Sequence, residues 1–190
     1  MNVLFLTLLD FNSIDEHNIY TDLLREFVKH GHEVYVISPV ERRKKQKTKL
    51  LRGEKATILK LRIGNTLYTT PPITLCKAIE FIKKRDNAQT YLMLKDIFPQ
   101  NAVDIGMLSK TGWKGILYRY FRNKEKKLYE LSDYIGCMSQ ANVDYVLKAN
   151  PNVKPGKVEI CPNSIEVIDE SVNEKTRINI RNKYGIPLDK

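Results

Sequence analysis

Short apolar runs alternate with segments of helical periodicity along this chain, and no other feature constrains the fold as much. Residues 2–9 are nearly all apolar, which is typical of a parallel strand buried on both faces of a sheet. Apolar residues then recur at helical spacing between Ile19 and Val28, and a run rich in β-branched and aromatic residues follows at 32–40. A strand, a helix and a strand of these lengths predict a βαβ unit.

The same alternation continues through the rest of the chain. Further strands are predicted at residues 56–64, 66–70, 90–95, 133–139 and 157–165. Helices are predicted at residues 73–85, 112–132 and 140–150, and residues 174–186 can form one more. The charge run at 41–49 is typical of a solvated loop, and the capping-box spacing of Ser13 and Glu16 indicates where the first helix starts. The whole pattern predicts a doubly wound, Rossmann-like α/β sheet.

Charge and cysteine content narrow the classes of partner and ligand. The formal net charge is +10, which suggests nucleic acid, an anionic membrane or phosphorylated ligands, with an ordinary basic protein as the alternative. Cys76, Cys137 and Cys161 are far apart, so we expect no bound metal and no cofactor, and a reducing compartment fits. The apolar start of the chain is shorter than the roughly 20 residues that span a bilayer. We therefore expect a cytoplasmic protein.

The loops after the predicted strands are the places to look for a ligand, because doubly wound sheets bind ligands beyond the carboxyl ends of their strands. The first of these loops contains no glycine, so the dinucleotide-binding pattern is absent there, and so is a Walker loop. Polar side chains do stand at the strand ends: Asp10, Asn12, Thr70, Lys95, Asp96, Ser139 and Asn163. Hydroxyl, amide and carboxylate groups suit a polyhydroxylated ligand such as a sugar.

The helix predicted at 112–132 offers a second surface. Its first half mixes aromatic and aliphatic residues, among them Trp113 and Tyr120, with lysines and arginines. This mixture favours the interface of an anionic membrane. A core helix with a solvated basic face is an equal alternative. Nucleic acid is a third one, but no helix-turn-helix, RNP-type strand or zinc-finger spacing supports it, so we expect no nucleic-acid partner.

The strand-end loops, taken in order, resemble a known family. The stretches VLFLTLLDF, GHEVYVISP, YTTPPITL, YLMLKDIFPQNAVD, LSDYIGCMSQANVDYV and VEICPNSIE are similar to the N-terminal half of bacterial family-four glycosyltransferases of capsule and O-antigen polysaccharide assembly. The resemblance covers nearly the whole chain. Such enzymes have two Rossmann-like domains in the GT-B fold, of which the N-terminal one holds the acceptor and the C-terminal one the nucleotide-sugar.

The resemblance implies a domain organisation and a reaction. Residues 1–168 would be the Rossmann-like acceptor-binding domain, and 169–190 a polar tail or linker towards a donor-binding domain that is missing here. The full enzyme would be a retaining, metal-independent transferase that moves a sugar from a nucleotide-sugar to a lipid-linked saccharide at the inner face of the cell membrane. The alternative is a non-catalytic basic module that binds a membrane surface or a protein partner.

The resemblance also suggests roles for single residues. The loop with Asp96 would face the interdomain cleft and supply a catalytic group, with a helix cap or a salt bridge as the structural alternative. The predicted acceptor-binding residues are Asp10, Asn12, Thr70, Lys95, Ser139 and Asn163, and the predicted membrane-binding residues are Lys114, Arg119, Arg122 and Lys126. Two departures stand out. Ser164 replaces a family glycine, and a helical segment usual between residues 65 and 66 is absent, whether trimmed or disordered.

Overall fold

The computed structural model describes residues 1–7, 9–10, 12–41, 46–63, 75–165, 167 and 173–187. The strand predicted at 66–70 and the candidate residue Thr70 lie outside these ranges. The described chain contains helices and parallel strands in alternation, as the sequence predicts. The mixed α/β class is therefore confirmed.

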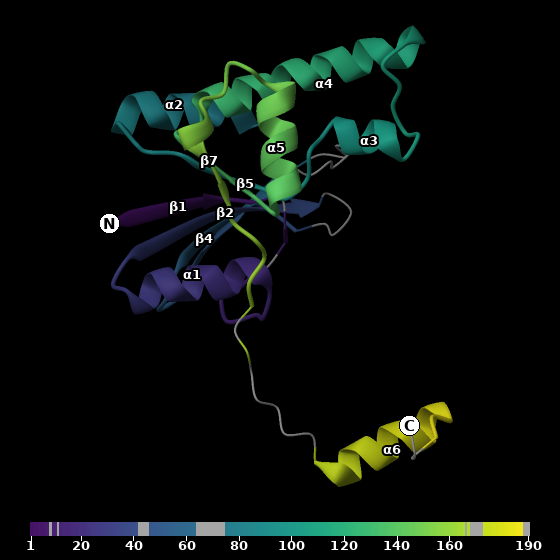
Figure 1. The fold of residues 1–190 in the computed structure, drawn as a ribbon. Helices are drawn as coiled ribbons and strands as arrows, with labels where there is room; N and C mark the ends of the chain where they lie inside the picture. The colour runs from purple at the N-terminus through teal and green to yellow at the C-terminus, as the bar shows by residue number, and fades with distance from the viewer. Residues whose placement is uncertain are drawn as a thin grey trace.

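The N-terminal half of the chain forms a four-stranded sheet (Figure 1). Its parallel strands are β1 (Asn2–Leu6), β2 (Glu33–Glu41) and β4 (Thr57–Ile63), and β3 (Lys49–Arg52) pairs with β4 in the antiparallel sense. The order across the sheet is β1-β2-β4-β3. Helix α1 (Ile19–Lys29) covers one face of this sheet, and apolar side chains are buried between them.

One local prediction for this half is wrong, and one strand was not predicted. The described residues 46–48 of the charge run at 41–49 are exposed coil, as predicted, and they lead into β3, a short edge strand that the sequence did not predict. The first helix is capped by Asn18 and Thr21, not by the Ser13–Glu16 pair. Ile14, which precedes the cap, is buried in the apolar cluster of this half.

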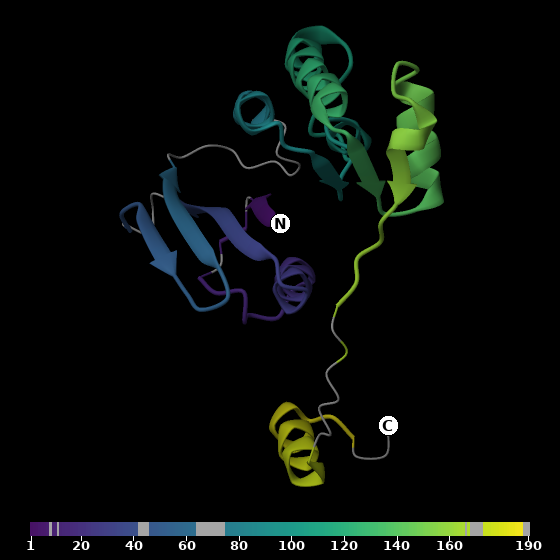
Figure 2. The same cartoon turned by 90° about the vertical axis from the view of Figure 1, so that its left-hand side faces the viewer.

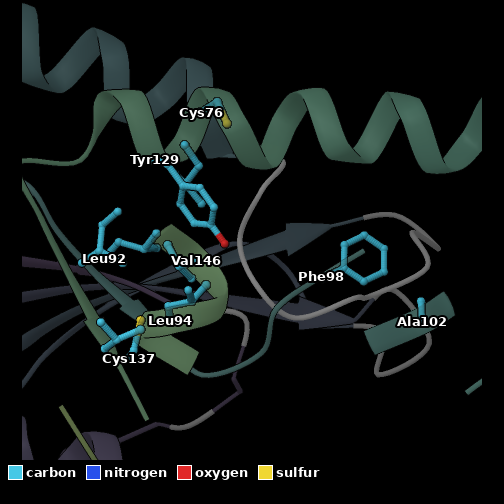
Figure 3. Packing of buried hydrophobic residues seen from close by; sticks show 11 residues of the cluster. Cys76, Leu92, Leu94, Phe98, Ala102, Tyr129, Cys137 and Val146 are labelled. Carbon is cyan, nitrogen blue, oxygen red and sulfur yellow. The ribbon is translucent and has the colours of Figure 1, made fainter. Parts of the chain in front are cut away.

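The C-terminal half forms a separate three-stranded parallel sheet of β5 (Tyr91–Leu94), β6 (Tyr134–Cys137) and β7 (Val158–Ile160). The helices of this half are α2 (Cys76–Asp86), α3 (Gln100–Asp104), α4 (Gly112–Leu131) and α5 (Gln140–Ala149). A large apolar cluster lies between the strands and the helices, and Figure 3 shows Tyr129 of α4 reaching towards Val146 of α5. Cys76 and Cys137 belong to this core.

The sequence predicts one sheet, whereas the described strands form two (Figure 2). Each sheet has its own apolar cluster, so each half buries apolar surface without strand pairing to the other. Helix α6 (Glu174–Tyr184) forms at the predicted tail and lies apart from both sheets. Among the described residues, no helix is both long enough and apolar enough to cross a bilayer.

Candidate functional site

A buried ion pair marks the carboxyl end of the first sheet. Lys60 of β4 is fully buried, and its ammonium group pairs with the carboxylate of Asp10, whose side chain is 24% exposed. Asp10 lies in the loop after β1, so the pair ties this loop to a neighbouring part of the sheet. A charge buried this deeply needs a partner of opposite sign. The predicted acceptor residue Asp10 is thus held in place by a lysine.

Hydrogen bonds to β2 hold the same loop. The hydroxyl of the buried Ser38 donates to the carbonyl oxygen of Leu9 at 2.6 Å. The backbone N–H of Thr7 donates to the carbonyl of Ile37 at 3.1 Å. Ser38 is also the register partner of Lys60 across the β2–β4 ladder. The chain therefore leaves β1 in a fixed direction, which presents Asp10 at the strand ends.

Asp96, the predicted catalytic residue, lies near the first turn of α1. Burial raises the pKa of the Tyr20 hydroxyl, and the negative charge of Asp96 raises it further. The ring of Tyr20 lies 5.7 Å from that of Phe5 on β1. The loop after β5 thus approaches the start of the helix that follows β1. Lys95, beside Asp96, is half-buried.

The loop that carries Asp96 is anchored to the core of the second half by Phe98. This side chain is buried in the larger core, and its ring lies 5.0 Å from that of Phe121 on α4 in an edge-to-face arrangement. Figure 3 shows Phe98 beside Ala102 of α3. A polar residue that follows a strand directly and precedes such an anchor has little freedom to move. This is the kind of position from which a carboxylate can orient a bound hydroxyl group.

Asn12 lies near the start of β4, on the same face of the sheet as Lys60. It lines a polar pocket of about 270 Å³ between the loop after β1 and the turn from β3 to β4. Lys55 of that turn bonds to Asp15 at 2.5 Å, which lowers the pKa of the Asp15 carboxyl. The backbone N–H of Asn12 donates to Glu16 Oε1 at 3.0 Å. Asn12 therefore belongs to a separate hollow, not to the Asp10–Lys60 pair.

The remaining predicted acceptor residues have exposed or structural positions. Ser139 is the N-cap of α5, and its hydroxyl accepts from the backbone N–H of Asn142 at 3.4 Å. Asn163 is exposed in the extended segment after β7. Ser139 follows the central strand β6, and Asn163 follows the adjacent β7, so both stand at the carboxyl edge of the second sheet.

The basic helix α4 presents some of its predicted membrane-binding residues but not all of them. Arg119 and Lys126 are exposed, and Lys114 is half-buried. Arg122 points inward, where it bonds to Glu125 at 2.6 Å and to the carbonyl oxygen of Ala149 at 2.9 Å. The prediction of Arg122 as a surface cation is therefore corrected, because the guanidinium group joins α4 to the end of α5.

Two contributors to the candidate site were missed at the level of the sequence. Tyr20 gave no signal there, because an aromatic residue in the first turn of an amphipathic helix is unremarkable. Lys60 did carry a signal. It shares its side of β4 with the buried Ile58, two residues earlier, so the alternation of the strand points the lysine inward.

The arrangement offers hydrogen-bonding groups and charges but no metal-binding cluster within the part of the chain that the structure describes. Carboxylates at the strand ends can accept hydrogen bonds from the hydroxyl groups of a ligand, and the neighbouring lysines can donate. Comparison with known proteins adds no further assignment. No family model matches the chain, and no curated protein does.

Proposed function

We propose that this chain is the acceptor-binding domain of a retaining glycosyltransferase that acts on a lipid-linked saccharide in surface polysaccharide biosynthesis. The observation that carries the proposal is that a carboxylate lies in the loop after the first strand of each sheet. Asp10 comes from the loop after β1, held by Lys60, and Asp96 comes from the loop after β5, beside Tyr20. Two fixed carboxylates at strand ends suit a polyhydroxylated acceptor.

The finer architecture belongs to the same proposal. A doubly wound sheet, as in the N-terminal half of the GT-B fold, would require β1 to pair with β5. Both strands stand at an edge of their sheets, and all strands of the two sheets except β3 are parallel to their neighbours. The nucleotide-sugar would be held by a C-terminal domain of such an enzyme. The peripheral location at the inner membrane face follows from the lipid-linked acceptor.

Within this reaction Asp96 would act as a general base or would orient the acceptor hydroxyl. Asp96→Asn keeps the shape of the side chain and removes its charge. In an enzyme that joins this domain to its donor-binding domain, turnover should fall by at least about 10²-fold. The melting temperature should change by only a few degrees, since changes at surface loops usually cost under about 0.5 kcal/mol.

The matched control is Asp144→Asn, on the exposed side of α5, where the carboxylate accepts a bond from Gln140. This variant should retain full turnover. Near-normal turnover of Asp96→Asn, or a failure of that variant to fold, would assign Asp96 a structural role instead.

The proposal also predicts that residues 1–190 alone do not transfer sugar. Stabilising a leaving nucleotide diphosphate needs positioned cations or backbone donors, and the sequence has no phosphate-cradling glycine loop. Incubation of the isolated chain with a panel of nucleotide-sugars, and detection of released nucleotide, tests this point. Turnover of any of them would contradict it.

A second candidate function is a non-catalytic module that docks on a membrane or on a protein partner. The exposed apolar and basic side chains of α4 favour it. The gene beyond the codon for Lys190 distinguishes the two. A continuous second α/β domain supports the transferase, and a stop codon favours the module.

A further inference from the structure

Five large apolar side chains are more than half exposed where α3 leads into α4. We call this surface the α3–α4 corner. Its members and their exposed fractions are Ile105 (71%), Met107 (60%), Trp113 (76%), Ile116 (65%) and Tyr120 (54%). Single exposed apolar residues are ordinary on protein surfaces, but a group within sixteen residues of sequence is a sign of an interaction site.

The helical members of the corner lie on one side of α4. Trp113, Ile116 and Tyr120 are spaced by three and four residues, so they share one face of the helix. The face that packs on the second sheet is a different one and carries Leu128 and Tyr129. Ile105 and Met107 lie in the connection that leads into the first turn of α4 (Figure 1). The two groups are thus close in sequence at one end of the molecule.

The structure also separates the aromatic residues of this helix into two classes. Phe121 packs against the core and contacts Phe98, and Tyr118 is only half-exposed. Trp113 and Tyr120 project outward. The sequence pattern grouped all four of these aromatic residues of α4 together, whereas only the outward pair is available to a partner.

Cations accompany the outward apolar side chains. Lys114 Nζ lies 6.0 Å from the ring centroid of Trp113, and Lys124 Nζ lies 5.6 Å from that of Tyr120. Lys110 Nζ lies 5.7 Å from the ring centroid of Tyr118. Between residues 105 and 124 the sequence contains no aspartate or glutamate at all. The partner of the corner must therefore tolerate cations and gain from apolar insertion.

We propose that the α3–α4 corner inserts its apolar side chains into the outer layer of an anionic bilayer, while the lysines beside them contact lipid phosphates. The inference rests on the proposed function, which requires a membrane-bound acceptor, and it adds the anchor and its mode of binding. An anionic bilayer fits the charge of the corner, because its headgroups attract cations and its acyl chains accept aromatic and aliphatic side chains. Cationic attraction alone would leave Trp113 in water.

The chain carries its own reporter for this insertion, because Trp113 is the only tryptophan in the sequence. We expect its fluorescence to shift to the blue when the 190-residue chain is mixed with vesicles of phosphatidylglycerol and phosphatidylcholine. Lipids brominated near the headgroup should quench the emission more strongly than lipids brominated near the chain end. Part of the binding should persist in high salt, since apolar insertion is not screened.

Variants test the residues themselves. The triple variant Met107→Ser, Ile116→Ser and Tyr120→Ser keeps the tryptophan. It should bind the same vesicles at least about 100-fold more weakly, because it loses three apolar side chains that would enter the bilayer. The matched control is Phe81→Ser, Ile165→Ser and Tyr184→Ser, which removes three side chains of similar exposure elsewhere. The control should bind like the parent chain, and circular dichroism should show both variants folded.

The possible results separate the inference from the function it rests on. Vesicle binding without a blue shift would overturn insertion and leave cationic association intact. No binding at any salt concentration would overturn both insertion and the membrane location. A blue shift that grows with protein concentration in the absence of vesicles would assign the corner to self-association and overturn the proposal. In each case, full activity on a water-soluble acceptor would still support glycosyl transfer. That activity is measured in an enzyme that joins this domain to its donor-binding domain.

Discussion

Lys60 and Glu125 are buried charged side chains, one in each half of the molecule, but the access of their partners to water differs. Lys60 is fully buried and pairs with Asp10, a quarter of whose side chain reaches solvent. Glu125 is 3% exposed and pairs with Arg122, which is itself largely buried. The Glu125 carboxylate also accepts a bond of 2.7 Å from the Tyr129 hydroxyl.

The different solvent access of the two partners indicates different roles: a candidate binding site in the first half and a structural contact between helices in the second. In the first half, the exposed end of the ion pair is Asp10, a group at the strand ends that can meet a ligand. In the second half, Arg122 bonds further to Ala149 and Asn150, so the partner of the buried charge joins α4 to the end of α5. A buried charge with a solvent-exposed partner can serve binding, whereas one enclosed by helices serves packing.

The largest expected effect comes from the Arg122–Glu125 pair. Arg122→Met leaves the Glu125 carboxylate buried without its ion partner and removes the bonds to the end of α5. We expect a loss of about 3–5 kcal/mol in the free energy of unfolding, measured by urea denaturation. Arg119→Met on the exposed side of the same helix is the control and should cost under about 0.5 kcal/mol. A loss below about 1 kcal/mol for Arg122→Met would remove the contrast between the two halves.

The pH dependence of stability tests the burial of the Glu125 carboxylate. Burial raises the pKa of Glu125, and the bonds from Tyr129 and Arg122 offset this only in part. A raised pKa in the folded state favours the protonated form, so the contribution of Glu125 to stability is full below pH 4.5 and is lost as the pH rises through the folded-state pKa. Relative to the parent chain, Glu125→Gln should therefore gain stability as the pH rises.

The gain should be at most about 1.4 kcal/mol per pH unit, the limit for one proton. Urea denaturation of both proteins at half-unit steps between pH 4.5 and 7.5 measures the difference. A difference between the two proteins that is independent of pH would contradict the assignment.

Lys60→Met should have a smaller effect than Arg122→Met, although Lys60 is the more deeply buried. Methionine replaces a buried ion with an apolar side chain of similar length, and the surviving Asp10 reaches water. The cost of about 3–5 kcal/mol for breaking a buried pair comes from the charge left buried without a partner. Because Asp10 can be solvated, we expect a change within about 1 kcal/mol. Lys55→Met, which breaks the exposed pair with Asp15, should change stability by under about 1 kcal/mol. A loss of about 3 kcal/mol or more for Lys60→Met would show that the carboxyl-end pair is also structural.

The smallest expected effects distinguish two helix caps, one from each half. Asn18 accepts from the N–H groups of Tyr20 and Thr21 at 2.9 and 3.0 Å, within a reciprocal capping box. Ser139 accepts from Asn142 at a longer 3.4 Å. Asn18→Ala should therefore cost about 1 kcal/mol and Ser139→Ala about half as much. Thermal melts of both variants measure this order, and the reverse order would contradict it.

The helices and most strands could be predicted because they depend on local apolar periodicity. Strand β3 could not, since it is only four residues long, starts at the last residue of the charge run and is held by pairing with β4, which is a tertiary contact. The division into two sheets also lies beyond local patterns. Whether β1 pairs with β5 depends on how two halves of the chain meet, and no residue of either strand encodes that choice.

The candidate site was predicted in its positions but not in its partners. The rule that ligands bind at strand ends identified Asp10 and Asp96. It could not give Lys60 as the partner of Asp10, because the pair is separated by fifty residues. Nor could it show Arg122 turning inward, since the carbonyl and amide groups that it meets at the end of α5 come together only in the folded chain.

Gly136 sits in the middle of the second sheet, where the side chain of Tyr91 crosses it to donate to Glu159 at 2.8 Å. A Cβ atom at residue 136 would overlap the Tyr91 hydroxyl and would lie 2.6 Å from the Cβ of Cys161. The tyrosine thus fills the space of the side chain that glycine lacks. In evolutionary terms three positions are coupled: alanine at residue 136 requires the side chain at 91 to move aside or become small, and residue 161 to shift as well. Substitution histories of related sequences should therefore show changes at 136 together with changes at 91 or 161.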